Sequence, residues 1–207
     1  MRRLDLTVIK LGGSHAFAPY LPRWIEAIAR HRGSIVLVPG GGPFADAVRA
    51  AQPKMGFDDR AAHRMALLAM EQYGCALASG RKRFSLADTR AAIDRALGLR
   101  QVPVWLPTRM VLAAPEIPWS WDVTSDSLAA WLAGRIGARR LLLVKHDATA
   151  AIVRARELLR RGVVDQAFPR FLRASRIPAI VLGPAGHAAL GDLIRGKASV
   201  GTQIDAG

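Results

Sequence analysis

Short apolar segments alternate with longer helical segments along almost the whole chain, and this alternation is the strongest constraint on the fold. The segments that read as strands are mostly apolar runs at 4–11, 34–38, 102–106, 140–144, 179–182 and 200–204. Helical patterns occupy 19–32, 43–51, 58–73, 86–97, 125–136, 150–161, 163–175 and 185–195. Strands that alternate with helices of this length form a mostly parallel sheet with helices on both faces. The sequence therefore predicts an α/β fold, a three-layer αβα sandwich with a mostly parallel central sheet.

Local residue choices mark several helix starts. Pro43 stands where the first turn of a helix tolerates proline. Asp58 or Asp59 is suited to cap the helix that follows. Ser85, with Asp88 three residues later, resembles a capping box and predicts that a helix begins at 86.

Length and composition fit one domain that spans 1–207. The chain has 207 residues, of which 51% are hydrophobic, enough to bury a core. Cys75 is the only cysteine, which excludes a disulfide framework and a cysteine-based zinc site. No apolar run approaches the ~18 to 20 residues of a membrane span, and charged residues interrupt the N-terminal segment that a signal peptide would need. We therefore expect a cytoplasmic protein.

The charge balance favours anionic partners. Thirty Lys and Arg residues face 16 Asp and Glu residues, for a net charge of +14. The basic residues are spread along the chain, and only five of the 30 are Lys, so an Arg-rich coding bias accounts for much of the surplus. This distribution disfavours a nucleic acid or a membrane as the partner and leaves small phosphorylated molecules.

Two glycine clusters follow the first two predicted strands, where open parallel sheets bind their ligands. Gly12 and Gly13 follow the first strand, and Gly40, Gly41 and Gly42 follow the second. Glycines let backbone N–H groups face an anion at the start of a helix. Lys10 lies among apolar residues just before the first cluster, where a lysine is costly to bury without an anion. Tight turns and a snorkelling lysine are the plain alternative, but together the three features indicate a phosphate site.

A third polar cluster begins the helix at 125–136. Thr124 or Ser125 can cap this helix, which puts Asp126 in its first turn, a favourable place for a carboxylate. Asp126 either orients a lysine, holds a magnesium ion or serves only the helix cap.

The segments 8–14, 38–45 and 124–128 together resemble the amino acid kinase family, and the resemblance runs over nearly the whole chain. Further stretches at 62–66, 70–71, 105–109, 119–121 and 164–169 resemble the members that phosphorylate an aminomethylfuran-methyl phosphate in methanofuran biosynthesis. The Gly-His pair of isopentenyl phosphate kinases is replaced by Ala45-Asp46, and the glycine triplet lacks the continuation of bacterial uridylate kinases. The resemblance thus implies an ATP- and Mg²⁺-dependent kinase that converts a small phosphate monoester to a diphosphate.

The family resemblance also implies a role for individual residues. Lys10 would neutralise charge on the transferring phosphoryl group, and Asp126 would orient that lysine. The nucleotide would contact residues after the first strand and after the strand at 140–144: Gly12, Gly13, Ser14, Lys145, His146 and Asp147. The acceptor would contact Gly40, Gly41, Gly42, His63, Thr124 and Ser125. The acceptor-binding part would span about 1–135 and the nucleotide-binding part about 136–207, in a homo-oligomer of two or more chains, with no metal held by the protein itself.

One segment departs from the family pattern. After the strand at 140–144 the family usually has a glycine-containing nucleotide loop, whereas 145–150 reads Lys-His-Asp-Ala-Thr-Ala. We therefore expect weak affinity for ATP. A family member that binds a phosphorylated metabolite without catalysis, a kinase for another small acid or phosphate, and a nucleic-acid-binding protein remain the alternatives.

Overall fold

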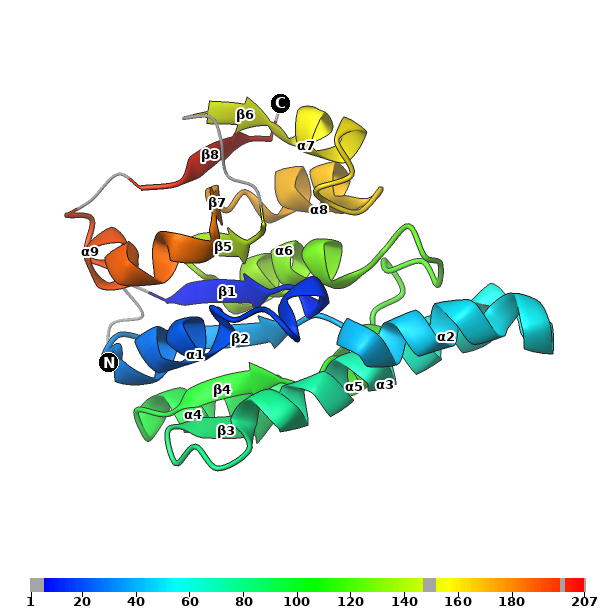
Figure 1. The fold of residues 1–207 in the computed structure, drawn as a ribbon, viewed down its shortest axis with the longest axis horizontal. Helices are drawn as coiled ribbons and strands as arrows, with labels where there is room; N and C mark the ends of the chain where they lie inside the picture. The colour runs from blue at the N-terminus through cyan, green and yellow to red at the C-terminus, as the bar shows by residue number, and fades with distance from the viewer. Residues whose placement is uncertain (1–5, 147–151, 198–199, 207) are drawn as a thin grey trace.

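A computed structural model describes residues 6–146, 152–197 and 200–206, and its strands form one sheet. The strand order is β3-β4-β2-β1-β5-β7-β8-β6 (Figure 1). The bounds are β1 Thr7–Leu11, β2 Ile35–Pro39, β3 Phe84–Ala87, β4 Val102–Trp105, β5 Arg140–Val144, β6 Ile152–Arg154, β7 Ala179–Leu182 and β8 Thr202–Asp205. Neighbouring strands are parallel except for β7 and β8, which are antiparallel. The predicted mostly parallel sheet is confirmed.

Helices cover both faces of the sheet. Their bounds are η1 Gly13–His15, α1 Leu21–Arg30, α2 Gly42–Met55, α3 Asp59–Ala78, α4 Arg90–Gly98, α5 Thr108–Leu112, α6 Ser125–Ile136, α7 Ala155–Arg160, α8 Phe168–Ser175, η2 Pro184–Ala189 and α9 Leu190–Ile194. Alternate residues of a strand face opposite layers, so Val8 packs in one core and Ile9 in the other. The first core lies under α4, α6 and α8, and the second under α1 and α9 (Figure 1). The three-layer α/β sandwich is confirmed.

The predicted helix at 86–97 begins later than its sequence suggests. Phe84–Ala87 is strand β3, which pairs with β4 along its whole length and buries Phe84 and Ala87. The helix starts at Arg90, and Thr89, not Ser85, caps it by accepting a hydrogen bond from Ala92 N at 3.1 Å. The Ser85–Asp88 pattern was misleading because pairing with β4 outweighs a local capping signal.

The predicted helix at 150–161 is also partly wrong. Ile152–Arg154 forms the edge strand β6, parallel to β8, and α7 begins only at Ala155. A three-residue strand carries too little periodicity to be recognised before its partner is known. Asp58 does cap α3, since its carboxylate accepts a hydrogen bond from Ala61 N at 2.8 Å. Within the described part of the chain, no helix combines the length and apolarity that crossing a bilayer requires.

Candidate active site

The three polar segments meet at the carboxyl edge of the central strands. β1 lies between β2 and β5, and Lys10 is in register with Val38 and Leu143. Both glycine turns and Lys145 therefore leave the sheet side by side, in the place where parallel sheets bind ligands. This convergence follows from strand adjacency, which the sequence pattern alone does not fix.

Asp126 bridges two lysines at this edge. Its Oδ1 lies 2.8 Å from Lys10 Nζ, and its Oδ2 accepts a hydrogen bond of 2.8 Å from Lys145 Nζ. The first turn of α6 carries Asp126, β1 carries Lys10, and the residue just after β5 is Lys145. The Lys10 and Asp126 side chains are only 5% and 7% exposed. The expected contact between Lys10 and Asp126 is present, and Lys145 joins the same cluster.

Burial and mutual attraction compete within this cluster. Burial lowers the pKa of Lys10 to about 8, although the Asp126 carboxylate opposes the shift. Burial alone would raise the pKa of Asp126, but the two ammonium groups outweigh it and hold this pKa at about 2. Two cations thus share one carboxylate in a poorly solvated place, an arrangement that favours binding of a further anion.

The two glycine turns pack backbone against backbone. A Cβ atom on Gly13 would overlap the backbone nitrogen of Gly42, and one on Gly40 would overlap that of Gly13. Gly42 also has a φ of +58°, which side chains rarely adopt. Glycine is therefore required here for close approach of the two turns.

Asp165, which the sequence analysis did not single out, caps α6 from a distant segment. It accepts hydrogen bonds from Thr124 N at 3.1 Å, Thr124 Oγ1 at 2.8 Å and Ser127 N at 3.0 Å, and also from Ser127 Oγ. Thr124 is the N-cap residue, as predicted, but its side chain makes no capping bond of its own, and Asp165 supplies the acceptor instead. Burial raises the pKa of Asp165, and the nearby Asp126 carboxylate adds to this rise. The cap holds the helix turn that carries Asp126.

We predict that Asp165→Ala lowers the free energy of unfolding by roughly 1–3 kcal/mol, because four donors would lose their acceptor in a buried place. Urea unfolding followed by circular dichroism measures this loss. Asp192→Ala is the control, since it removes an exposed carboxylate that pairs with Arg195 on the surface. Equal unfolding midpoints for the two variants would contradict the capping role.

A cavity of about 200 Å³ opens beside the glycine turns. Most predicted acceptor residues line it, and so do Gly13 and Ser14, which the family resemblance placed on the nucleotide side. The lining residues are Gly13, Ser14, Gly41, Gly42, Ala45, Asp46, Arg49, His63, Ala66, Leu67, Met70, Trp121, Val123, Thr124, Ser125 and Leu128. The cavity is bordered by apolar and aromatic side chains with a few polar groups, as is typical of small-molecule sites.

His63 and two tryptophans form the aromatic part of this site. His63 is 3% exposed and stacks on Trp119, with ring centroids 6.2 Å apart. Its Nε2 is buried with no hydrogen-bond partner among the described residues. Burial lowers the pKa of His63. The Arg49 guanidinium lies 4.5 Å from the centre of the Trp121 ring. Both tryptophans belong to the segment 119–121 that carries part of the family resemblance, and the sequence pattern assigned them no role.

On the nucleotide side, only part of the predicted set is described. Lys145 contacts Asp126, and His146 is exposed and contacts Tyr20, whose hydroxyl lies 2.8 Å from His146 Nδ1. Asp147 lies outside the described residues. No group of three or more His, Cys, Asp or Glu side chains within the described ranges is arranged to hold a metal ion.

Comparisons with known proteins agree with this geometry. The sequence model of the amino acid kinase family matches residues 5–148. A [5-(aminomethyl)furan-3-yl]methyl phosphate kinase of Methanocaldococcus jannaschii is 24% identical over 209 residues, which cover 95% of this chain and 96% of the relative. The uridylate kinase of Archaeoglobus fulgidus superposes with a TM-score of 0.71 at 19% identity, covering 96% of this chain and 99% of that one. The UMP kinase of Bacillus anthracis superposes with a TM-score of 0.70 at 15% identity, and the match covers 98% of this chain and 96% of that one. The chain therefore belongs to the amino acid kinase family and is a phosphotransferase.

Proposed function

We propose that this protein transfers the terminal phosphoryl group of ATP to a small phosphate monoester and forms a diphosphate. The observation that carries the proposal is the buried Lys10–Asp126–Lys145 cluster beside two glycine turns. Phosphoryl transfer needs mainly positioning and positive charge around the phosphoryl oxygens, and this arrangement offers both. The acceptor is already an anion, so no strong general base is required.

Each group then has a defined part in the reaction. An acceptor phosphate oxygen attacks the terminal phosphorus of ATP, the bond from that phosphorus to the bridging oxygen breaks, and ADP leaves. Lys10 neutralises charge on the transferring group, and Asp126 holds Lys10 and Lys145 in place. Gly12, Gly13 and Ser14 bind the nucleotide phosphates, and Gly40, Gly41 and Gly42 bind the acceptor phosphate.

Magnesium fits this site as a companion of the nucleotide. Both Asp126 oxygens face lysines, and the Asp165 oxygens accept from Thr124 and Ser127. Both buried carboxylates therefore already have polar partners without a metal ion. Mg²⁺ bound to the ATP phosphates would supply further positive charge at the phosphoryl oxygens.

The acceptor that fits best is an aminomethylfuran-methyl phosphate, the substrate named for the Methanocaldococcus jannaschii relative. Trp121 offers a flat aromatic wall, and the buried Nε2 of His63 offers a polar contact to a bound molecule. Asp46 lines the same cavity and is a suitable partner for an ammonium group. Thr124 and Ser125 complete the acceptor side.

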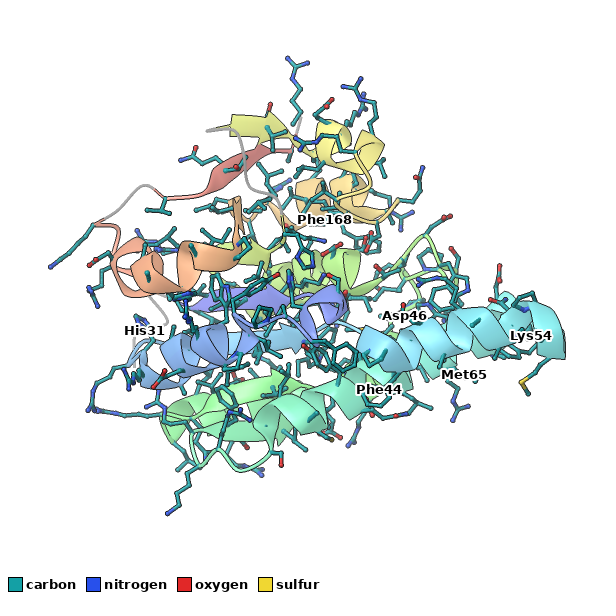
Figure 2. All side chains as sticks on the ribbon, in the orientation of Figure 1. His31, Phe44, Asp46, Lys54, Met65 and Phe168 are labelled. Carbon is teal, nitrogen blue, oxygen red and sulfur yellow. The ribbon has the colours of Figure 1, made fainter. Side chains whose placement is uncertain are left out.

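We further propose that about 1–135 binds the acceptor, that about 136–207 binds the nucleotide, and that the protein acts in the cytoplasm as a homo-oligomer. Large apolar side chains are exposed on α2 and α3, namely Phe44, Met65 and Leu68 at 38%, 36% and 42% (Figure 2 labels the first two). The two helices pack against each other, and exposed apolar side chains on neighbouring helices are suited to a contact between protein chains. Light scattering on the purified protein tests the oligomeric state, and a monomer at all concentrations would contradict it.

The test of the reaction is phosphorus NMR of the protein with ATP, Mg²⁺ and the aminomethylfuran-methyl phosphate. We expect new diphosphate resonances together with ADP, and none when the acceptor is omitted. UMP and isopentenyl phosphate serve as comparison acceptors. If the monoester binds in calorimetry but no diphosphate forms, the non-catalytic binding alternative replaces the kinase.

Lys145→Ala is expected to weaken ATP binding by roughly ten- to a hundredfold, because a charge-assisted contact to phosphate contributes about 1.5–3 kcal/mol. The loss should shrink with added salt. Affinity for the phosphate monoester should change little, and calorimetry with each ligand separately measures both. Lys82→Ala is the matched control, since Lys82 is exposed and precedes β3, at the opposite edge of the sheet. Equal ATP affinity in the two variants would remove Lys145 from nucleotide binding.

A further inference from the structure

Three side chains from separate parts of the chain form a hydrogen-bonded row near Lys10. His15 lies in η1, Tyr20 precedes α1, and His146 follows β5. His15 Nδ1 is 2.7 Å from the Tyr20 hydroxyl oxygen, which is 2.8 Å from His146 Nδ1. The centroids of the His15 and His146 rings are 4.3 Å apart. The row therefore links the turn after β1 to the segment after β5.

The proton positions along this row follow from one backbone carbonyl. His15 Nε2 lies 2.9 Å from the carbonyl oxygen of Val144, and because a carbonyl only accepts, Nε2 must carry the hydrogen. His15 is fully buried, and burial lowers its pKa to about 4, so the ring is neutral and its Nδ1 is an acceptor. Tyr20 therefore donates to His15 Nδ1. The Tyr20 oxygen then accepts from His146, which must carry a hydrogen on Nδ1.

This assignment determines what His146 offers to a ligand. In its neutral form, an imidazole with its hydrogen on Nδ1 has its lone pair on Nε2, at the edge of the ring away from Tyr20. His146 is exposed, so this nitrogen is accessible. A lone pair repels phosphate oxygens and attracts O–H or N–H donors. The neighbouring Lys145 and the buried Lys10 supply the charge that phosphates need.

We propose that Tyr20 and His15 are positioning residues that present His146 Nε2 as a hydrogen-bond acceptor to a hydroxyl or amino group of the nucleoside. This inference rests on the proposed kinase function, and it divides the nucleotide site into a lysine part for the phosphates and a His146 part for the nucleoside. The row of three side chains ties His146 to the turn after β1 and so fixes the orientation of its ring.

The chain offers a matched pair of variants, because Tyr20 and Tyr73 are its only tyrosines. The Tyr73 hydroxyl is buried with no hydrogen-bond partner among the described residues, whereas that of Tyr20 bridges two imidazoles. For Tyr20→Phe we expect KM for ATP to rise about tenfold, while kcat and KM for the acceptor stay within about twofold. Tyr73→Phe should leave all three unchanged. His146→Phe keeps an aromatic ring at an exposed position and should reproduce the loss in ATP affinity.

Nucleotide analogues identify which donor is bound. The wild type is assayed with three analogues of ATP. The analogue 2′-deoxy-ATP lacks the ribose 2′-hydroxyl, 3′-deoxy-ATP lacks the 3′-hydroxyl, and purine riboside triphosphate lacks the adenine amino group. We expect the wild type to bind one of these analogues about tenfold more weakly than ATP. The Tyr20→Phe variant should bind that same analogue and ATP with equal affinity. If the wild type discriminates against none of the three, the inference is overturned.

Nitrogen NMR of the histidine rings gives a readout that does not depend on activity. We expect the Nδ1–H form of His146 in the wild type and in Tyr73→Phe, and a shift toward Nε2–H in Tyr20→Phe. An Nε2–H form in the wild type overturns the inference. If the wild type binds ATP and Tyr20→Phe binds it equally well, only this inference fails. A wild type that binds no nucleotide with Mg²⁺ at millimolar concentration overturns the proposed function together with the inference.

Discussion

Replacement of Lys10 by methionine is expected to reduce phosphoryl transfer by roughly a hundred- to thousandfold, the loss typical when one preorganised group that stabilises transition-state charge is removed. Lys10 is 4% exposed beside the glycine turns, so no solvent cation takes its place at the phosphoryl oxygens. The reduction should appear in kcat, measured by coupled release of ADP at saturating substrates. Lys82→Met, a change at an exposed lysine beyond the other edge of the sheet, should retain wild-type turnover.

The same replacement is expected to leave the fold at least as stable as the wild type. Burial lowers the pKa of Lys10 to about 8 from 10.5, which means that the folded protein holds this charge less readily than the unfolded chain does. Methionine has a similar length and no charge to desolvate, and Lys145 still neutralises Asp126. A thermal unfolding midpoint at or above that of the wild type, with lost turnover, separates a catalytic role from a structural one. Near-normal turnover would remove Lys10 from the mechanism.

The pKa of Lys10 also gives the reaction a pH dependence of known sign. As the pH rises through about 8, Lys10 in the free protein loses its proton, so kcat/KM should fall. The effect on stability has the opposite sign. Between about pH 8 and pH 10.5, the unfolded chain still binds the proton that Lys10 has released in the folded protein. The free energy of unfolding should therefore increase as the pH rises through this range.

The sequence predicted the parts of the site that depend on local residue choice. A lysine inside an apolar run, glycines after two strands and an aspartate in a first helical turn are each visible in a few neighbouring residues. The fold class followed from the alternation of segments, since a helical stretch between two strands leads to a parallel sheet. The family resemblance predicted a contact between Lys10 and Asp126. The distance of 2.8 Å between Lys10 Nζ and Asp126 Oδ1 agrees with this prediction.

The features that were missed depend on contacts between distant segments. Nothing near Asp165 indicates that it caps a helix beginning some forty residues earlier, at Ser125. The predicted helix at 86–97 includes the last two residues of β3 because the burial of that strand depends on β4, and β6 was missed because its partner β8 lies some fifty residues further along the chain. The row of His15, Tyr20 and His146 likewise exists only because β1 and β5 are neighbours. Local propensity cannot predict such contacts, because tertiary pairing decides them.

Asp126→Asn is expected to cost both activity and stability. The wild-type cluster has two ammonium groups on one carboxylate, and the variant would leave both cations buried without it. Breaking a buried ion pair by removing one partner typically lowers the free energy of unfolding by about 3–5 kcal/mol. Lys10 would also lose its orientation, and its pKa would fall further below 8, so turnover at neutral pH should fall by roughly a hundredfold or more.

The double variant Asp126→Asn, Lys145→Met distinguishes the two losses. It restores the wild-type balance of one net positive charge in the cluster, so most of the lost unfolding free energy should return. Activity should not return, because no carboxylate then holds Lys10 toward the phosphoryl group. Urea unfolding and ADP release on the three proteins measure both quantities. Recovery of turnover in the double variant would mean that Asp126 serves only to balance charge, whereas unchanged turnover in Asp126→Asn alone would leave it no part in the reaction.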